Sequence, residues 1–306
     1  MSGPSFEPPA GIGATTPPPA VLLPDQALLF EHRAQRLTAW TDGHPMADFL
    51  GFLVNLAVSQ HKAAGALPPP VLPPQDLLNQ RVAGSMPVLP RETAALDGRW
   101  RQALTHILAE FATGDLPAPA RQAVETLAAE EATSLDARAA RFLIGELSAD
   151  DLAASVFVAA ALQVQWTAQA AALPAGLLRS LTPPGLCPVC GLPPVASVIM
   201  AGDPLEGVRY LGCGLCGTRW HFPRARCSSC DTDKKVAYLA FEGQQAHARA
   251  ETCGECRTYL KVFDEAKSPG VEFLADDLAT VGLDLRLAEE KWHRAAANPF
   301  LMAASR

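Results

Sequence analysis

The residues of this sequence with the clearest chemistry are its eight cysteines, which form four Cys-x-x-Cys pairs between Cys187 and Cys256. Twenty-two residues separate the first pair from the second, and 22 again separate the third from the fourth. A shift of 40 positions lays the first two pairs onto the last two, so this region is an internal repeat. The pairs are Cys187 and Cys190, Cys213 and Cys216, Cys227 and Cys230, and Cys253 and Cys256.

This spacing is typical of metal-binding turns. Two cysteines separated by two residues present both sulfurs to one ion, and two such turns complete a tetrahedral shell of four sulfurs that suits zinc or a single rubredoxin-like iron. Pairing within each repeat is favoured over an interleaved arrangement, which stays open. The favoured sites are Cys187, Cys190, Cys213 and Cys216 for one ion, and Cys227, Cys230, Cys253 and Cys256 for the other.

The residue that follows the second cysteine of such a turn often adopts a left-handed backbone conformation, which glycine tolerates best. Gly191 and Gly217 occupy this position in the first repeat, and Asp231 and Arg257 occupy it in the second. The first repeat therefore fits the pattern closely. The second fits it more loosely at Arg257, and the sequence leaves open whether its metal is exposed.

Two other uses of paired cysteines compete with metal binding. A disulfide framework requires an oxidising compartment and usually a small chain, whereas this chain has 306 residues and begins without an apolar leader. Thioredoxin-type redox pairs normally occur singly at the start of a helix. Four pairs at a repeated spacing favour two metal sites of four sulfurs each.

The elements that must position these turns begin with a helical half. Residues 1–24 are rich in proline and predict a flexible tail. Residues 25–180 are rich in alanine and carry apolar residues at helical spacing, which predicts an all-helical domain. Helices are expected over 25–40, from Pro45 onward, over 76–82, 93–113, 118–133 and 136–145, and from the capping box at Ser148–Asp151 to Pro174.

Short strands next to the cysteine turns are expected after Pro183-Pro184-Gly185, where β-branched runs replace the alanine pattern. The fold class is therefore multidomain, with an all-helical N-terminal domain followed by two tandem rubredoxin-like or zinc-ribbon modules. The modules are expected over 181–224 and 225–270, with a C-terminal helical segment over 271–306. The strands are predicted at 195–200, 208–211, 218–222, 236–241 and 259–263.

Several other residues could carry chemistry, but a structural role is favoured for each. Trp220 and Leu260 are equivalent in the repeat and are expected to pack on their own metal turns, and His221 is not needed as a ligand because eight sulfurs fill two sites. Asp276 and Asp277 are adjacent on a helix predicted over 271–287, so their side chains face different directions and do not form a catalytic pair. The remaining candidates are His32, His44, His61 and His106, and the arginine pairs Arg33 with Arg36 and Arg99 with Arg101, which could mark a surface for an acidic partner but are more typical of solvated helix faces.

Charge argues against nucleic acid as a partner. The stretch from Cys187 to Cys256 holds seven lysines and arginines and seven aspartates and glutamates, and the whole chain has a formal charge of −7. Four thiolates around each divalent ion add further negative charge, so there is little counterion release to gain from binding phosphates. The sequence also lacks a Walker loop, a dinucleotide fingerprint, a GxSxG elbow and an HExxH helix.

Membrane insertion is not expected, because no uncharged apolar run reaches the roughly 18 residues needed to span a bilayer. The longest candidate, 152–164, is interpreted as a buried helix. The first residues lack a basic region, an apolar region and a twin-arginine motif. Together with paired reduced cysteines, this predicts a cytoplasmic protein.

Several segments resemble the FdhE family of formate dehydrogenase accessory proteins. The segments are CPVCG with the following PVASVI, the LGC-x-LC-x-T-x-WH run, AETC-x-x-C-x-x-YLK, LADDLA and NPFL. The resemblance is dense over about 183–301, and all eight cysteines match the family's four motifs. It is fainter in the helical half, where it runs through Phe30, Arg33, Ala34, Arg36, Leu37, His44 and Pro45.

The resemblance implies a cytoplasmic maturation factor and not an enzyme. Its partner would be the catalytic subunit of respiratory formate dehydrogenase, bound before export, which carries molybdopterin and an iron–sulfur cluster. The family's sites look rubredoxin-like and are thought to hold iron, which suggests a redox role in activating the client. Two mononuclear metal ions, each held by four cysteines, are therefore expected, with iron favoured and zinc possible.

Two other classes of function remain open. A stand-alone electron-transfer protein would show reversible one-electron reduction without a stable client. A purely structural zinc scaffold for protein interaction would be colourless and redox-inactive. A metalloenzyme is disfavoured because eight sulfurs close both coordination shells.

Overall fold

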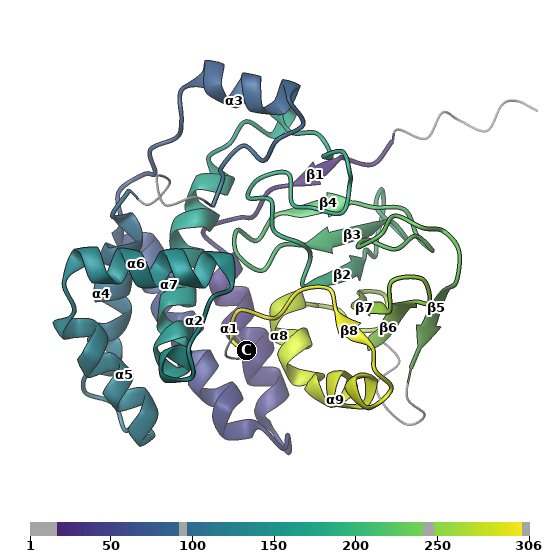
Figure 1. Ribbon diagram of the computed structural model, residues 1–306. Coiled ribbons are helices and arrows are strands. Elements are labelled where there is room, and N and C mark those ends of the chain that lie inside the picture. Colours follow the sequence, from purple (N-terminus) through teal and green to yellow (C-terminus); the bar gives the residue numbers. More distant parts are fainter. Residues whose placement is uncertain (1–16, 92–96, 241–247, 302–306) are drawn as a thin grey trace, which may run out of the picture.

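The computed structural model describes residues 17–91, 97–240 and 248–301 of the 306-residue chain. Within these parts, the first half is helical, as the sequence predicts, and the second half forms one mixed sheet followed by α8 (Phe273–Ala279) and α9 (Val281–Glu289) (Figure 1). The predicted tail, 1–24, lies mostly outside the described residues.

The helical half is built around α7 (Leu152–Ala171), which is buried on nearly all sides. Its sequence is apolar and carries no charge, and its buried Gln163 and Gln165 are hydrogen-bonded to neighbouring elements, so it can lie at the centre of the bundle. The capping box at Ser148 and Asp151 forms as predicted, on a 3-10 turn (Ala149–Asp151) that leads into the helix. The other helices are α1 (Leu29–Thr41), α2 (Ala47–Ala66), α3 (Gln75–Ala83), α4 (Arg99–Phe111), α5 (Ala118–Ala129) and α6 (Ala132–Ile144).

The sheet has the order β1-β4-β3-β2-β7-β6-β5, with β8 paired to β7 off this path. The 40-residue repeat is visible in it, because β2 (Ala196–Ile199), β3 (Arg209–Gly212) and β4 (Arg219–His221) form one antiparallel set of three. The strands β5 (Val236–Leu239), β6 (Ala248–Cys253) and β7 (Thr258–Asp264) form the second set in the same way. Each set is one module of the predicted zinc-ribbon type.

The two modules are joined edge to edge, because β2 pairs with β7 in parallel and Ala196 lies opposite Lys261. This pairing makes one continuous sheet from two repeats. The sequence prediction had neither this pairing nor β6, whose Ala-Arg-Ala-Glu stretch favours helix by propensity and becomes a strand only between two neighbours.

The segment after the second module folds back between the helical half and the sheet (Figure 1). The single helix predicted over 271–287 is wrong in detail, because Thr280 breaks it into α8 (Phe273–Ala279) and α9 (Val281–Glu289). The two carboxylates face different ways, as predicted. Asp276 accepts hydrogen bonds from Arg36, and Asp277 pairs with Lys261.

Arg33 and Arg36 of α1 do not form a partner surface or a solvated face, and this expectation is corrected. Arg33 is buried and forms an ion pair with Glu272 at 3.2 Å, while Arg36 pairs with Asp276 at 2.6 Å. Both arginines therefore attach α1 to the start of α8.

The end of the proline-rich stretch also belongs to the fold. Val21–Leu22 forms β1, which pairs antiparallel with β4 and places Val21 opposite Trp220. The Tyr210 hydroxyl donates to the carbonyl of Pro19 at 2.8 Å. The expectation of a flexible tail is therefore corrected for these residues, because the edge of the first module supplies hydrogen-bond partners that the sequence could not reveal.

One apolar cluster links the helical half to the first module. It contains Trp166 of α7 together with Cys187, Trp220 and Leu278. The domain boundaries themselves stay a prediction. In the described parts of the chain, no individual helix has the length and apolar composition to cross a membrane, and α6 with the segment Ala149–Ala171 passes that test only as a pair bent by 107°.

Candidate metal centres

All four cysteine pairs form the same backbone turn. The N–H of the residue after the second cysteine donates to the carbonyl of the first cysteine, at 2.9 Å from Gly191 to Cys187 and at 2.9 Å from Arg257 to Cys253. The residue after the second cysteine has a left-handed backbone in every turn, as predicted, with φ of 78° at Gly191 and 71° at Gly217. Asp231 and Arg257 adopt the same conformation at φ 61° although they are not glycine.

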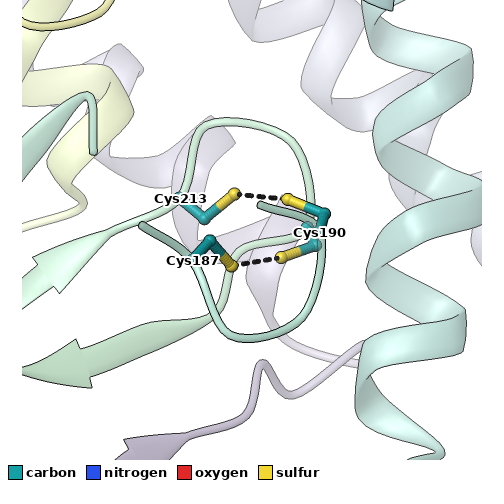
Figure 2. Close-up of side chains that lie close together, drawn as sticks. Cys187, Cys190 and Cys213 are labelled. Atoms are coloured by element: carbon teal, nitrogen blue, oxygen red, sulfur yellow. Dashed lines mark hydrogen bonds between the residues drawn. The ribbon is translucent and has the colours of Figure 1, made fainter. Parts of the chain in front are cut away.

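The first cluster gathers four sulfurs from two of these turns (Figure 2). The Sγ atoms of Cys187 and Cys216 lie 3.6 Å apart, and those of Cys190 and Cys213 lie 3.3 Å apart. All four cysteines are buried, and the second turn begins at the end of β3. Figure 2 shows the labelled side chains directed into one space between the two loops.

The second cluster repeats this arrangement at the outer end of the sheet. The Sγ atoms of Cys227 and Cys256 lie 3.7 Å apart, and those of Cys230 and Cys253 lie 3.6 Å apart. Its burial differs from that of the first cluster, because Cys230 is exposed and Cys256 is half-buried. The structure thus brings together the cysteine sets that were expected within each repeat, and not an interleaved set.

The spacing of the sulfurs fits a tetrahedral metal. Sulfurs bound to one ion at a metal–sulfur distance of about 2.3 Å lie about 3.8 Å apart, close to the observed separations of 3.3 to 3.7 Å. These distances are far longer than a disulfide bond of about 2.05 Å. A donor set of four sulfurs accommodates either zinc or iron. That these cysteines bind metal stays a prediction.

Thiol acidity is uneven within each cluster of the metal-free protein. Burial raises the pKa of Cys187 and Cys190 well above the usual range. Burial would also raise the pKa of Cys213, but hydrogen bonds from Cys187 and Cys190 bring it well below the usual value. In the second cluster, partial desolvation among the other thiols and hydrogen bonds with Cys256 and Cys253 together raise the pKa of Cys230 to about 12, although one side of this residue is exposed. A metal ion must therefore displace protons when it binds.

Cys256 of the second cluster has a lowered pKa. Desolvation would raise its pKa, but hydrogen bonding to Thr258 lowers it to about 7. The Thr258 hydroxyl lies 2.9 Å from the sulfur of Cys256, and Thr218 lies 3.2 Å from Cys216 in the first repeat. Sequence reasoning missed both threonines, although the 40-residue shift superposes them and could have identified them.

A buried glutamine of the helical half supports the first cluster. Gln163 of α7 donates from Nε2 to the carbonyl of Gly214, between Cys213 and Cys216, at 2.7 Å. Its Oε1 accepts from Arg33 and from Gln60, each at 2.9 Å. The helical half is therefore hydrogen-bonded directly to the turn between Cys213 and Cys216. No signal in the sequence marks this contact, because it joins residues 51 positions apart.

The remaining candidates differ in their surroundings. His61 and His106 are exposed. Arg99 is buried, so the expectation of a solvated face is corrected for it, and Arg101 pairs with Asp136. Trp220 and Leu260 are buried, and the Trp220 indole N–H donates to the carbonyl of Pro184 at 3.0 Å. His221 lies on β4 with its ring against Tyr210, and burial lowers its pKa. His44 accepts from the Met46 N–H at Nδ1 and reaches the carbonyl of Ala279 with Nε2. In the described ranges, the two cysteine clusters are the sole groups of potential ligands close enough to share an ion.

Comparison with known proteins covers nearly the whole chain. Three family models match it, described as FdhE, N-terminal, over residues 18–182, FdhE, central domain, over 186–224, and FdhE, C-terminal domain, over 225–301. A protein FdhE homolog of Edwardsiella ictaluri is 36% identical over 94% of this chain and 93% of its own length. One from Rhizobium meliloti is 34% identical, with 96% of each chain covered.

A solved structure matches the fold as well. The crystal structure of the FdhE protein from Pseudomonas aeruginosa superposes with a TM-score of 0.82 at 34% identity. The match covers 94% of this chain and 100% of that one. The family models, the full-length relatives and the superposed fold agree with the resemblance seen in the cysteine motifs, and the chain belongs to the FdhE family.

Proposed function

We propose that this chain is a formate dehydrogenase maturation protein that binds the catalytic subunit in the cytoplasm and supports its activation. The observation that supports this most strongly is the pair of four-cysteine clusters on a chain similar to FdhE over nearly its full length. The helical half and one face of the modules are the proposed contact with the folded client. The function is one of binding and support, not of turnover.

Each cluster is proposed to hold one mononuclear ion, with iron favoured and zinc possible. The donor set and the sulfur spacing of 3.3 to 3.7 Å fit such an ion. Iron in this shell would supply one-electron chemistry for activation of the client. Four protein sulfurs fill a tetrahedral shell and leave no position for a substrate, which argues against a metalloenzyme.

Client binding is tested by co-purification. The affinity-tagged full chain is expressed together with the catalytic subunit of formate dehydrogenase, and in parallel with the electron-transfer subunit of the same enzyme as a control prey. We expect the catalytic subunit to be recovered with the tagged chain and the electron-transfer subunit not to be recovered. Failure to recover it with protein that carries two metal ions would overturn the proposed client.

The metal is identified on anaerobically purified protein by elemental analysis and a visible spectrum. About two irons per chain with a thiolate charge-transfer colour that bleaches on reduction support a redox step. Two zincs per chain and no visible colour, in protein expressed at its native level, would instead indicate a chaperone whose metal sites are purely structural. Iron that cycles reversibly in a protein without a client would indicate a stand-alone electron carrier.

A further inference from the structure

We infer that the two centres are functionally unequal, so that the first is a closed structural site and the second exchanges its metal with external ligands at Cys230. This inference rests on the metal binding proposed above. It assigns to the second centre an activity that follows neither from the cysteine spacing nor from the family resemblance.

The exposure of the ligands separates the centres. In the first cluster, Cys187, Cys213 and Cys216 are 0% exposed and Cys190 is 1% exposed. In the second, Cys227 and Cys253 are buried, but Cys230 is exposed to solvent and Cys256 is half-buried. A bound ion would lie about 2.3 Å from each sulfur. An external ligand would therefore approach it from the side of Cys230 and Cys256, the two cysteines that solvent reaches.

The helical half accounts for the closure of the first centre. A Cβ at Gly191 would meet Pro87 at 2.8 Å, and one at Gly217 would meet Leu29 at 2.9 Å and Pro24 at 3.2 Å. The backbone also pairs there, because the N–H groups of Val88 and Leu89 donate to the carbonyls of Pro188 and Val189. The outer faces of both turns are therefore covered, and a Cβ at either glycine would have to displace a neighbouring side chain.

No comparable cover lies over the turn that carries Cys230 in the described part of the chain. Its neighbours Ser229, Asp233, Lys234 and Lys235 are exposed, as are Ala237 to Leu239 of the adjoining edge strand. The fourth turn is partly covered, because Arg257 stacks on Trp292 at 3.8 Å and donates to the carbonyl of Glu290. Both positions that hold glycine in the first repeat accommodate a side chain here, since Asp231 pairs with Arg226 at 2.7 Å and Arg257 packs on Trp292. The first repeat thus has glycine at these positions where other residues cover the turns, and the second has larger residues where the turns are less covered.

Access of this kind permits ligand substitution at the ion. An incoming thiolate or nitrogen donor forms a bond to the metal while the bond between the metal and Cys230 Sγ breaks. The released Cys230 thiolate takes a proton from water, and no electron is transferred. Repetition at Cys256 and then at the inner sulfurs releases the ion. In the first centre a donor reaches the metal only after the helical half has opened.

Zinc-loaded full-length protein tests this with a chelator. Two zincs per chain are first verified by elemental analysis, and release is then followed by the absorbance of excess 4-(2-pyridylazo)resorcinol. One zinc is expected in a fast phase and one in a phase slower by at least about tenfold, because the slow phase requires opening of the structure. Urea below the unfolding transition should accelerate the slow phase and leave the fast one nearly unchanged.

Variants assign each phase to a centre. Cys230→Ser should abolish the fast phase and keep the slow one. Cys190→Ser, at the equivalent position of the first repeat, should lose the slow zinc or fail to fold, and either result agrees with a structural first centre. Release of both zincs in one phase, or loss of the slow phase in Cys230→Ser, would overturn the inference. Protein without zinc would instead overturn the proposed metal binding itself.

Discussion

Gly191 is required by both its backbone conformation and its packing. It combines a left-handed backbone with a contact that leaves no room for a Cβ, since Pro87 lies 2.8 Å from where that atom would be. The equivalent position of the second repeat carries Asp231 in the same conformation, and its side chain has room to pair with Arg226 at 2.7 Å. Both repeats therefore need a left-handed backbone at this position, and the first also lacks the space for a Cβ.

Gly191→Ala is expected to destabilise the metal-loaded protein by about 2–3 kcal/mol, from the left-handed conformation and the clash with Pro87 together. Gly43→Ala is the matched control, because Gly43 has φ 66° but no atom within 4 Å of the added Cβ. The control should cost about 1 kcal/mol. Urea unfolding of both variants measures the difference, and equal losses would contradict a steric role for Pro87.

Thiol acidity predicts a pH dependence of metal uptake. The raised pKa of Cys187, Cys190 and Cys230 keeps these thiols protonated in the metal-free protein near neutral pH. A metal must displace those protons, so affinity should rise by roughly tenfold per pH unit for each proton displaced. Competition titrations against a chelator of known affinity at about pH 6, 7 and 8 measure this. An affinity that does not change over this range would refute it.

The contact that ties the C-terminal segment to the helical half is the attachment of α1 to α8. Arg33 pairs with Glu272, and Arg36 pairs with Asp276, which also accepts from the Trp40 indole N–H at 3.2 Å. Gln163 extends the same hydrogen-bonded network to the turn of the first centre. Buried ion pairs are weak evidence for added stability, but removal of one partner leaves the other desolvated and unpaired. The network therefore fixes the position of α8 between helices and sheet.

Arg36→Leu should destabilise the protein by about 2–4 kcal/mol at pH 7 and by less at pH 5. Burial already raises the pKa of Asp276, whereas Arg36 lowers it, so the variant raises it further. A raised folded-state pKa gives stability at low pH that is lost as pH rises through that value, so acid relieves the variant by protonating Asp276.

Arg101→Leu is the control for this prediction, because the pair of Arg101 with Asp136 is only partly buried. It should cost about 1 kcal/mol or less. Urea unfolding of both variants at pH 5 and pH 7 measures the loss of unfolding free energy for each variant at each pH. A penalty for Arg36→Leu that is the same at both pH values would show that the charge of Asp276 is not its cause.

At the scale of the whole molecule, the chain closes on itself at the first module. β1 adds a strand to β4, and Leu29 and Pro24 cover Gly217, so residues near the start of the described chain seal a site some 190 positions later. The apolar cluster that contains the first four cysteines runs into the helical half, whereas the second four lie outside it. The first module is therefore integrated into the core, and the second projects from it.

Deletion of residues 1–24 should destabilise the protein by about 2 kcal/mol or more, through loss of several hydrogen bonds from β1 and its neighbours. It should also speed release of the slow zinc. A deletion of residues 1–16 made in parallel isolates the contribution of residues 17–24. Thermal unfolding and chelator release on both proteins provide the comparison, and identical behaviour would exclude a role for β1 in closing the first centre.

The sequence by itself determined the cysteine turns, the helical half and most of the strands, because these depend on residues close together or on a repeat that is visible in the chain. The within-repeat pairing of the sulfurs was likewise favoured in advance, since each repeat closes its own antiparallel set of strands. The same spacing that defines the turns also predicted the left-handed residue that ends each of them.

Only the tertiary structure decided the parallel pairing of β2 with β7, the addition of β1, the internal roles of Arg33 and Arg36 and the unequal burial of the two centres. Each of these depends on surfaces that meet across long stretches of chain, where no periodicity or spacing carries a signal. Two repeats with nearly the same ligands thus differ in exposure, because one packs against the helical half and the other faces water.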